Sequence, residues 1–403
     1  MVEAKEFVDA LKAERMGPCT GIPSGMLRGV IGAASSDPQL GYFTATSAAE
    51  AMGLAAGLAL AGSMAVVLVG SSGLANALDP LTSLNKIYGL PVLLVISVGD
   101  EPSLEDEAKD AVRERMTPHL LAAIGVPYEY AANEVDALRE QICRLGCIAR
   151  ESLAPVALLV KRGALAEENG PTYSASRCQR SAMSRSRAMQ TIVQCFNDDD
   201  AVIASTGSIA RELYNVNDRE NNFYLSGAAG CASAVALGVA LSQKHRRVVV
   251  LDGGETVLMH LGNIAAIGCY SPSKLIHIVL DSGRYDSAAG QPTLAKGVWL
   301  EGFPMSSGYT TVLAVDTEEG IRNFFMRITG RGPHFLRVVI APEPSPLVAH
   351  GNNERGAEAG PARFQIRPSE TAARFSAFLT RSCQGNGSSR LAKDGSPVAA
   401  PVG

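Results

Sequence analysis

The sequence predicts an α/β protein made of two doubly wound parallel-sheet domains. Short, unbroken apolar runs recur along the chain, and segments of helical character separate them. Runs of this kind are typical of parallel strands that are buried on both faces. The same alternation occurs once in each half of the chain, so each half is expected to form βαβ units with right-handed crossovers.

The expected elements follow from that alternation. In the first half, strands are predicted at residues 65–70, 91–98 and 155–161, and helices at 48–61, 79–87, 117–123 and 134–151. In the second half, strands are predicted at 201–206, 247–253, 274–281 and 334–341, and helices at 209–215, 231–242, 258–268 and 317–329. Residues 1–17 predict an amphipathic helix, and residues 368–379 predict a final capped helix.

The domain boundaries are predicted from changes in composition. The first α/β domain covers residues 1–163, and the second covers residues 191–342. Between them, residues 164–190 are rich in Ser, Arg, Gly and Glu, which is typical of a linker. Residues 343–380 form a C-terminal extension that holds the terminal helix, and residues 381–403 have the polar composition of a disordered tail.

The bulk composition argues against several classes of partner. The net charge is −4, whereas a nucleic-acid or anionic-membrane partner favours a basic surface. No apolar stretch reaches the roughly 20 residues of a membrane span, and the first residues lack a signal-peptide core. The eight cysteines include no CxxC pair, as expected of reduced thiols. We therefore expect a cytoplasmic protein with no membrane or nucleic-acid partner.

Several segments resemble one family of enzymes. They include TGIPSGML (residues 20–27), SSGLANALDPLTSLN (71–85), STGSIARELY (205–214), GCASAVALGVAL (230–241) and LGNIAAIGCYSPSKLIHIVLDSGRYDSAAGQPT (261–293). In this order they resemble phosphonopyruvate decarboxylase and its relative sulfopyruvate decarboxylase, which use thiamine diphosphate (ThDP). The resemblance implies a pyrimidine-binding half followed by a diphosphate-binding half.

The resemblance also implies an activity and partners. It implies a carboxy-lyase of phosphonate biosynthesis that decarboxylates a small anionic 2-oxo acid, such as phosphonopyruvate or sulfopyruvate. It further implies a homodimer or homotetramer whose active sites lie between subunits. ThDP and Mg²⁺ are the implied cofactors, since the diphosphate is held through a metal with hard oxygen ligands.

The first departure from the family pattern concerns the glutamate that activates the aminopyrimidine ring of ThDP. Counted back from Ala55-Ala56-Gly57, its position falls on Ala48. Glu50 is two residues later, about 200° further round a helix. Glu50 is therefore a candidate replacement only if the chain enters the helix along a different path.

The second departure concerns the metal motif, which in the family is Gly-Asp-Gly followed later by Asn. The Gly-Asp-Gly pattern falls on Gly253-Gly254-Glu255, and the Asn position is Ser282. Arg284 would supply a backbone carbonyl ligand, and its guanidinium could replace part of the positive charge of Mg²⁺. The family thus implies ThDP and Mg²⁺, but Ala48, Gly254 and Ser282 depart from the residue types that serve them in the family pattern.

The candidate site residues fall into three groups. The catalytic candidates are Glu50, Asp252, Glu255, His260, Tyr285 and Asp286. The candidates for cofactor binding are Thr206, Gly207, Ser208, Gly253, Gly254, Glu255, Ser282 and Arg284. The candidate metal ligands are Asp252, Glu255, Ser282 and Arg284. His277, inside an apolar strand, is expected to be a packed core residue.

Three functional hypotheses remain open from the sequence. In the first, the chain decarboxylates a small anionic 2-oxo acid with ThDP bound in an atypical way. In the second, a repurposed enzyme uses the same pocket without ThDP. In the third, a non-catalytic homologue serves as a partner or scaffold for another protein.

Overall fold

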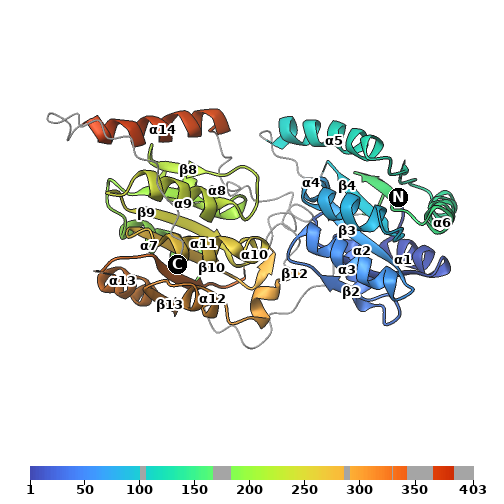
Figure 1. The fold of residues 1–403 in the computed structure, drawn as a ribbon, viewed down its shortest axis with the longest axis horizontal. Coiled ribbons are helices and arrows are strands. Elements are labelled where there is room, and N and C mark those ends of the chain that lie inside the picture. The colour runs from blue at the N-terminus through green and yellow to red at the C-terminus, as the bar shows by residue number, and fades with distance from the viewer. Residues whose placement is uncertain (100–105, 167–182, 286–290, 329, 343–365, 385–403) are drawn as a thin grey trace, which may run out of the picture.

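The computed structural model describes residues 1–99, 106–166, 183–285, 291–328, 330–342 and 366–384. Most of the predicted linker, the predicted tail beyond residue 384, and the catalytic candidate Asp286 lie outside these described residues. Figure 1 shows the two halves of the chain side by side, with the first half on the right and the second on the left. Each half is built around one parallel sheet, which confirms the predicted fold class.

The first half holds a sheet of six strands in the order β2-β1-β3-β4-β6-β5. All neighbouring strands run parallel. The strands are β1 (Met16–Gly21), β2 (Tyr42–Thr44), β3 (Met64–Gly70), β4 (Leu93–Val98), β5 (Tyr128–Tyr130) and β6 (Val156–Lys161).

Helices cover both faces of this sheet because its central strands are apolar on both sides. Val66 and Leu68 of β3 pack into one core with helices α1 (Ala4–Ala13), α2 (Arg28–Ser36) and α6 (Val135–Ser152). Their neighbours Val67 and Val69 face the other way. There they pack with α3 (Ala48–Leu60), α4 (Ser71–Pro80), the π-helical segment η1 (Leu81–Lys86) and α5 (Asp106–Ala123).

The second half repeats this architecture with six parallel strands in the order β13-β14-β10-β9-β7-β8. They are β7 (Ala201–Ala204), β8 (Asn222–Tyr224), β9 (Val248–Gly253), β10 (Leu275–Asp281), β13 (Thr311–Val315) and β14 (His334–Val339). A short antiparallel pair, β11 (Arg284–Tyr285) with β12 (Gln291–Pro292), follows β10.

Helices again cover both faces of the second sheet. One face packs against α7 (Arg185–Gln194), α8 (Ser208–Asn217) and α13 (Glu318–Arg327). The other packs against α9 (Ala232–Ser242), α10 (Gly254–Met259), α11 (Gly262–Tyr270) and α14 (Pro368–Gln384). The short helices η3 (Leu294–Gly297) and α12 (Gly302–Ser306) lie between β12 and β13 in the chain. No helix among the described residues is long and apolar enough to cross a membrane.

Three helix predictions need correction. The helix expected at residues 117–123 begins earlier, at Asp106. The helix expected at residues 79–87 begins earlier, as α4 at Ser71, and changes to a π-helix after Pro80. The helix expected at 258–268 is two helices, because His260 leaves helical geometry at φ −135° and ψ 54°. The second of these, α11, is anchored separately by Asn263, whose side chain donates to the backbone oxygen of Gly230 and contacts the Ser233 hydroxyl.

The predicted boundaries also shift at both ends of the second half. The linker was expected to reach residue 190, but α7 begins at Arg185, where Ser184 caps it by accepting from the N–H of Arg187. Helix α14 continues to Gln384, so the predicted tail cannot begin at residue 381. Short or polar segments carry a weak periodic signal, and several such elements were not predicted: the strands β1, β2, β5, β8, β11, β12 and β13 and the helices α2, η3 and α12.

Candidate functional site

The candidate site lies where three neighbouring strands of the second sheet end. Ala204 of β7 pairs with Leu251 of β9, and Gly253 of β9 pairs with Leu280 of β10. The chain passes from β7 out to β8 and then returns to β9 on the other side of β7, so the strand order reverses there. In open α/β sheets, ligands bind outside the carboxyl ends of the strands at such a switch point.

The loop after β7 has the form of an anion cradle. Thr206 is followed by Gly207, whose φ of 82° favours glycine, and by Ser208, the first residue of the ten-residue helix α8. The first N–H groups of a helix have no intrahelical partner, so they can bind an anion. Ser205, only 1 % exposed, has a hydroxyl without a hydrogen-bond partner. The structure confirms that Thr206 and Gly207 directly precede a helix N-terminus, and diphosphate binding there stays a prediction.

Asp252, at the end of β9, points into the protein interior. It is fully buried, and its Oδ1 accepts from the Gly253 N–H at 3.2 Å and from the Thr256 hydroxyl. Its Oδ2 lies 3.6 Å from Nε2 of His277 on the neighbouring strand β10. The carboxylate therefore ties the start of α10 to the sheet core, and the structure does not present it to a ligand as a metal or catalytic group.

His277 is fully buried, which confirms that it is a core residue. Its Nδ1 lies 3.5 Å from the Tyr309 hydroxyl, and its ring packs edge-on against Phe335. Burial raises the pKa of the Tyr309 phenol, and the Asp252 charge raises it further. Asp252, His277 and Tyr309 thus form a buried polar chain beneath the candidate site.

Gly254 leaves no carboxylate at the expected metal position. A Cβ atom on Gly254 would lie 2.7 Å from Oδ1 of Asp281, so the Asp281 carboxylate borders this position. The Ser282 hydroxyl lies 3.3 Å from both the backbone oxygen and the backbone N–H of Arg284. The structure therefore brings together Gly254, Ser282 and Arg284, but Ser282 and the Arg284 carbonyl are neutral oxygen donors.

Tyr285 brings together candidate residues from the two halves of the chain. Its phenol is 5 % exposed, and burial raises its pKa. The carboxylates of Glu255 and Glu50 raise that pKa further, so both lie within electrostatic range of the phenol. In Figure 1, α10 and β12 lie on the side of the second half that faces the first. Glu50, Glu255 and Tyr285 are therefore grouped between the halves, with the tyrosine protonated.

Glu255 does not extend away from the chain. A Cβ atom on Gly253 would lie 2.9 Å from Oε2 of Glu255, which shows that the carboxylate folds back over that glycine. Its side chain thus stays beside the end of β9, half-buried, as the sequence hypothesis of a compensating carboxylate requires.

Glu50 and Ala48 lie on different sides of α3. Ala48 is fully buried, and its Cβ would lie 3.4 Å from a Cβ on Gly73 of α4. The Glu50 carboxylate instead accepts from the backbone N–H of Thr46 at 2.6 Å, as well as from its hydroxyl. Glu50 therefore stabilises the start of its own helix and does not occupy the place of Ala48.

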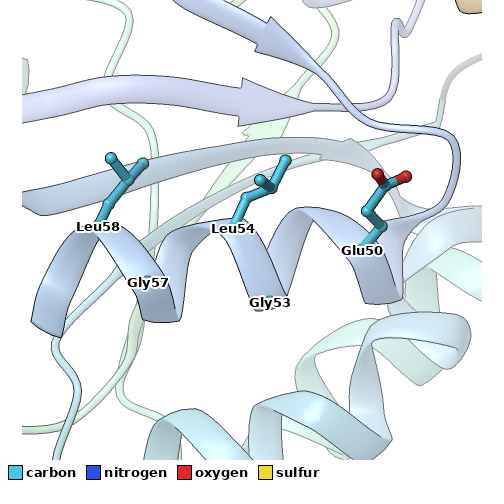
Figure 2. A pocket seen from close by; sticks show the side chains of 5 residues that line it. All are labelled: Glu50, Gly53, Leu54, Gly57 and Leu58. Atoms are coloured by element: carbon cyan, nitrogen blue, oxygen red, sulfur yellow. The ribbon is translucent and has the colours of Figure 1, made fainter.

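A shallow groove runs along the exposed side of α3. Figure 2 shows Glu50, Leu54 and Leu58 projecting from the same side of the helix, as residues four apart must. Gly53 and Gly57 complete the lining of the groove. The exposed part of α3 is thus apolar except for Glu50 at its beginning.

His260 lies between α10 and α11, where it packs on the backbone of Gly230. A Cβ on Gly230 would clash with the imidazole, 2.3 Å from Nδ1, and Gly230 has a φ of 83°. The Nδ1 atom is buried without a hydrogen-bond partner. The structure therefore gives His260 a packing role against Gly230, and no contact joins it to Glu255 or Tyr285 in the described residues.

The donor set does not fit the Mg²⁺ ion that the resemblance implies. Among the described residues, no group of three or more His, Cys, Asp or Glu side chains is placed to hold a metal. Mg²⁺ prefers carboxylate oxygen ligands in octahedral geometry. Asp252 points inward, Gly254 has no side chain, and Ser282 is neutral. Of the candidate metal ligands in the described chain, only Glu255 brings a carboxylate to this place, and it does so from the position after the one that the family pattern uses.

Two residues that shape this place were missed by the sequence analysis. Arg337 of β14 donates two hydrogen bonds to Oδ2 of Asp281, at 2.9 and 2.6 Å. Asp281 directly precedes Ser282, but its partner is 56 residues away in the chain. No local pattern reveals such a pair, because it depends on β10 and β14 being neighbours in the sheet.

Comparisons with known proteins agree with this architecture. Residues 204–316 match the family model described as thiamine pyrophosphate enzyme, C-terminal TPP binding domain. The phosphonopyruvate decarboxylase of Streptomyces viridochromogenes is 32% identical over 94% of this chain and 96% of its own length. That of Streptomyces hygroscopicus is 30% identical over 94% of both chains. The sulfopyruvate decarboxylase of Methanosarcina acetivorans is 28% identical over 72% of this chain and 79% of its own.

These similarities extend through both halves, and the matched TPP-binding domain includes the strand ends that form the candidate site. The chain therefore belongs to the phosphonopyruvate and sulfopyruvate decarboxylase family of ThDP enzymes.

Proposed function

We propose that this chain is a carbon–carbon lyase that acts on a small anionic 2-oxo acid of the phosphonopyruvate or sulfopyruvate type. The observation that carries the proposal is the identity of 32% to a phosphonopyruvate decarboxylase over 94% of the chain. The grouping of Tyr285 with Glu255 and Glu50 between the two halves supports it, because it supplies acid–base groups beside the strand-end loops.

Arg284 and Tyr285 have different proposed roles, one in binding the substrate anion and the other in proton transfer. A guanidinium binds phosphonate, sulfonate or carboxylate groups through paired hydrogen bonds, and Arg284, which precedes Tyr285 in β11 and is only partly buried, supplies one. Burial and the two carboxylates keep the Tyr285 phenol protonated, so it can donate a proton to the reacting substrate. ThDP supplies the electron sink that such decarboxylations need, and it is therefore the cofactor to offer in a test.

The test offers phosphonopyruvate, and separately sulfopyruvate, to the purified full-length chain with ThDP, and records the CO₂ released. We expect release from one of the two substrates. Tyr285→Phe is expected to lower kcat by about 100-fold, the lower range for loss of a general acid. The matched control is Tyr270→Phe, which removes a hydroxyl from an exposed tyrosine and leaves kcat unchanged. The absence of CO₂ from both substrates would overturn the proposal.

A second candidate function uses the same pocket without ThDP. Ala48 and Gly254 favour it, because each lacks the carboxylate that the cofactor chemistry of the family implies. Calorimetric binding of phosphonopyruvate without ThDP, and without CO₂ release, would support this candidate. No binding of either ligand, together with a stable complex with another protein, would support a non-catalytic role.

The triple variant Ala48→Glu/Gly254→Asp/Ser282→Asn restores the three residue types of the family pattern. It tests whether an inactive native chain lacks only these side chains or also lacks a site that can bind the cofactor and the substrate. Gain of decarboxylation by this variant would show that the scaffold is intact and that only the chemistry was lost. Its folding is checked first by circular dichroism, because a side chain at Gly254 must displace the Asp281 carboxylate and Ala48 is fully buried.

We also propose that the chain works as a homodimer or homotetramer with sites between subunits. Helix α3 is apolar on nearly every face, yet Leu54 is 40% and Leu60 is 74% exposed. Helix α9 of the second half is likewise apolar, and its Leu241 is 40% exposed. Helices that are hydrophobic all round are normally buried, so a second copy of the chain is the partner that this surface favours.

A further inference from the structure

The turn that follows β10 is held by its own aspartate. The Asp281 carboxylate is almost completely buried, with its side chain 2% exposed. Its Oδ1 accepts a hydrogen bond of 2.8 Å from the N–H of Gly283, two residues later. Gly283 has a φ of 66°, which lets the chain turn back toward Arg284. The carboxylate thus fixes the conformation that places the Ser282 hydroxyl next to the Arg284 carbonyl.

Arg337 supplies the positive charge for this carboxylate. Its Nε and one terminal nitrogen donate to Oδ2 of Asp281, and its other terminal nitrogen donates to Oε1 of Glu301 at 3.1 Å. Burial lowers the pKa of Arg337, but the carboxylates of Asp281 and Glu301 raise it above its ordinary value. The guanidinium therefore stays charged, with a carboxylate on each side. Paired bonds of this kind fix geometry as well as charge.

The Arg337–Asp281 pair borders the position of Gly254. Because a Cβ there would lie 2.7 Å from Oδ1 of Asp281, this carboxylate is the negative group nearest the Gly254 position in the described chain, while the Glu255 carboxylate lies over Gly253. Both of its oxygens are already bound, one by Gly283 and the other by Arg337. A divalent cation at this place would meet neutral oxygens of Ser282 and Arg284, and it would be repelled by the adjacent guanidinium.

We infer that Arg337 takes the role of a divalent cation at the carboxyl end of β10: it holds the Asp281–Arg284 turn in place, and the turn needs no metal. The inference concerns how the strand-end loop is held and does not depend on the proposed function. It also explains why the chain does not fit the metal motif of the family: the charge of the Asp281 carboxylate is balanced by Arg337.

The test compares cation responses of the full-length chain and two matched variants. Arg337→Gln removes the charge beside the buried Asp281, whereas Arg322→Gln removes a charge from a solvent-exposed pair with Glu318. Thermal unfolding is recorded in EDTA and in millimolar MgCl₂. We expect Mg²⁺ to raise the Tm of Arg337→Gln, because a ligand that binds only the folded state stabilises it. The native chain and Arg322→Gln should show the same Tm in both buffers.

A direct titration makes the test independent of how well the variants fold. Mn²⁺ is added to the native chain, and free Mn²⁺ is followed by electron paramagnetic resonance. We expect no saturable site tighter than about 1 mM, the weak end of oxygen-ligand sites. Saturable binding, or an Arg337→Gln variant that folds but ignores Mg²⁺, would overturn the inference. Neither readout uses enzymatic activity, so failure here is distinguishable from failure of the proposed function.

Discussion

At the scale of single residues, the candidate site differs from the family pattern in where its charged groups lie. Gly254 and Ser282 provide no negative charge, while the buried Asp281 next to them is balanced by Arg337. Asp252, one of the two acidic candidates that flank the Gly253-Gly254 pair, is directed toward His277 instead. The carboxylates of Glu255 and Glu50 remain within electrostatic range of Tyr285 and raise the pKa of its phenol.

Gly254 gives the sharpest prediction at this scale. Gly254→Ala would place a methyl group 2.7 Å from Oδ1 of Asp281, which Gly283 and Arg337 hold in place. We expect a loss of about 2 kcal/mol in the free energy of unfolding, as for overpacked interiors. Urea unfolding monitored by circular dichroism measures it.

The control for this substitution is Gly262→Ala in α11, where a Cβ would meet no atom within 4 Å. Its free energy of unfolding should change by less than about 0.5 kcal/mol, as for most unobstructed surface sites. Equal effects of the two substitutions would show that Asp281 yields freely to a side chain at Gly254.

The sequence identified three of the decisive residues and missed the Asp281–Arg337 pair, which lies beside two of them, Gly254 and Ser282. Ala48, Gly254 and Ser282 can be located by counting from matched segments, because each lies close to one. The Asp281–Arg337 pair cannot, since it joins strands that are distant in the chain and adjacent only in the sheet. The inward direction of Asp252 was likewise invisible, because it follows from packing against His277 on β10.

At the scale of secondary-structure elements, long strands that are apolar on both faces were predictable, whereas β1, with its Gly and Pro residues, and the short edge strands were not. The runs that form β3, β4, β9 and β10 are apolar on both faces, so composition alone marks them. Strand β5 has only three residues and is partly exposed, and it is recognised as a strand only through its pairing with β6. The break between α10 and α11 depends on tertiary contacts of Asn263.

Helix α14 shows how a terminal element is attached to the second sheet. Its Phe375 packs against Phe223 of β8, with ring centroids 5.5 Å apart. Its Arg374 donates to both carboxylate oxygens of Asp218, which also accepts from the Tyr224 hydroxyl at 2.8 Å. Burial raises the pKa of Asp218, but the bonds from Arg374 and Tyr224 lower it by more, so the net shift is downward.

This shift predicts that acid loosens α14. A carboxyl group whose folded pKa is depressed contributes stability above its unfolded pKa of about 4, and loses it as the pH falls through the lower folded value. Hydrogen exchange of the α14 amides, corrected for intrinsic rates, should therefore become faster as the pH falls below about 4.

Asp218→Asn is the matched variant for this experiment, because the amide keeps the shape but cannot lose a proton. Its α14 protection should be lower at neutral pH and should change little with acid. An unchanged protection of α14 in the native chain across that range would show that Asp218 does not attach the helix.

At the scale of the whole molecule, the two halves share one architecture, and each exposes apolar residues on one largely apolar helix. Both are six-stranded parallel sheets covered on both faces, and the candidate acid–base groups lie where the halves face each other. The exposed apolar residues of α3 and α9 remain as the surface that a second copy would cover.

The proposed self-association can be tested by a substitution that introduces one charged side chain on α3. Leu54→Glu places a carboxylate in the groove of α3, and we expect the variant to shift toward the monomer in analytical ultracentrifugation. Met326→Glu on α13 is the control, because Met326 is 66% exposed and lies outside α3 and α9. A native chain that is already monomeric at high concentration would contradict the proposal.

The central claim is that this member of the decarboxylase family retains a working pocket that is not organised by a divalent metal. Its most direct test is CO₂ release from phosphonopyruvate and sulfopyruvate by the native chain with ThDP, measured in EDTA and again with added Mg²⁺. The account predicts release from one substrate at the same rate in both buffers. Release that requires Mg²⁺ would contradict the role assigned to Arg337, and no release in either buffer would contradict the proposed function.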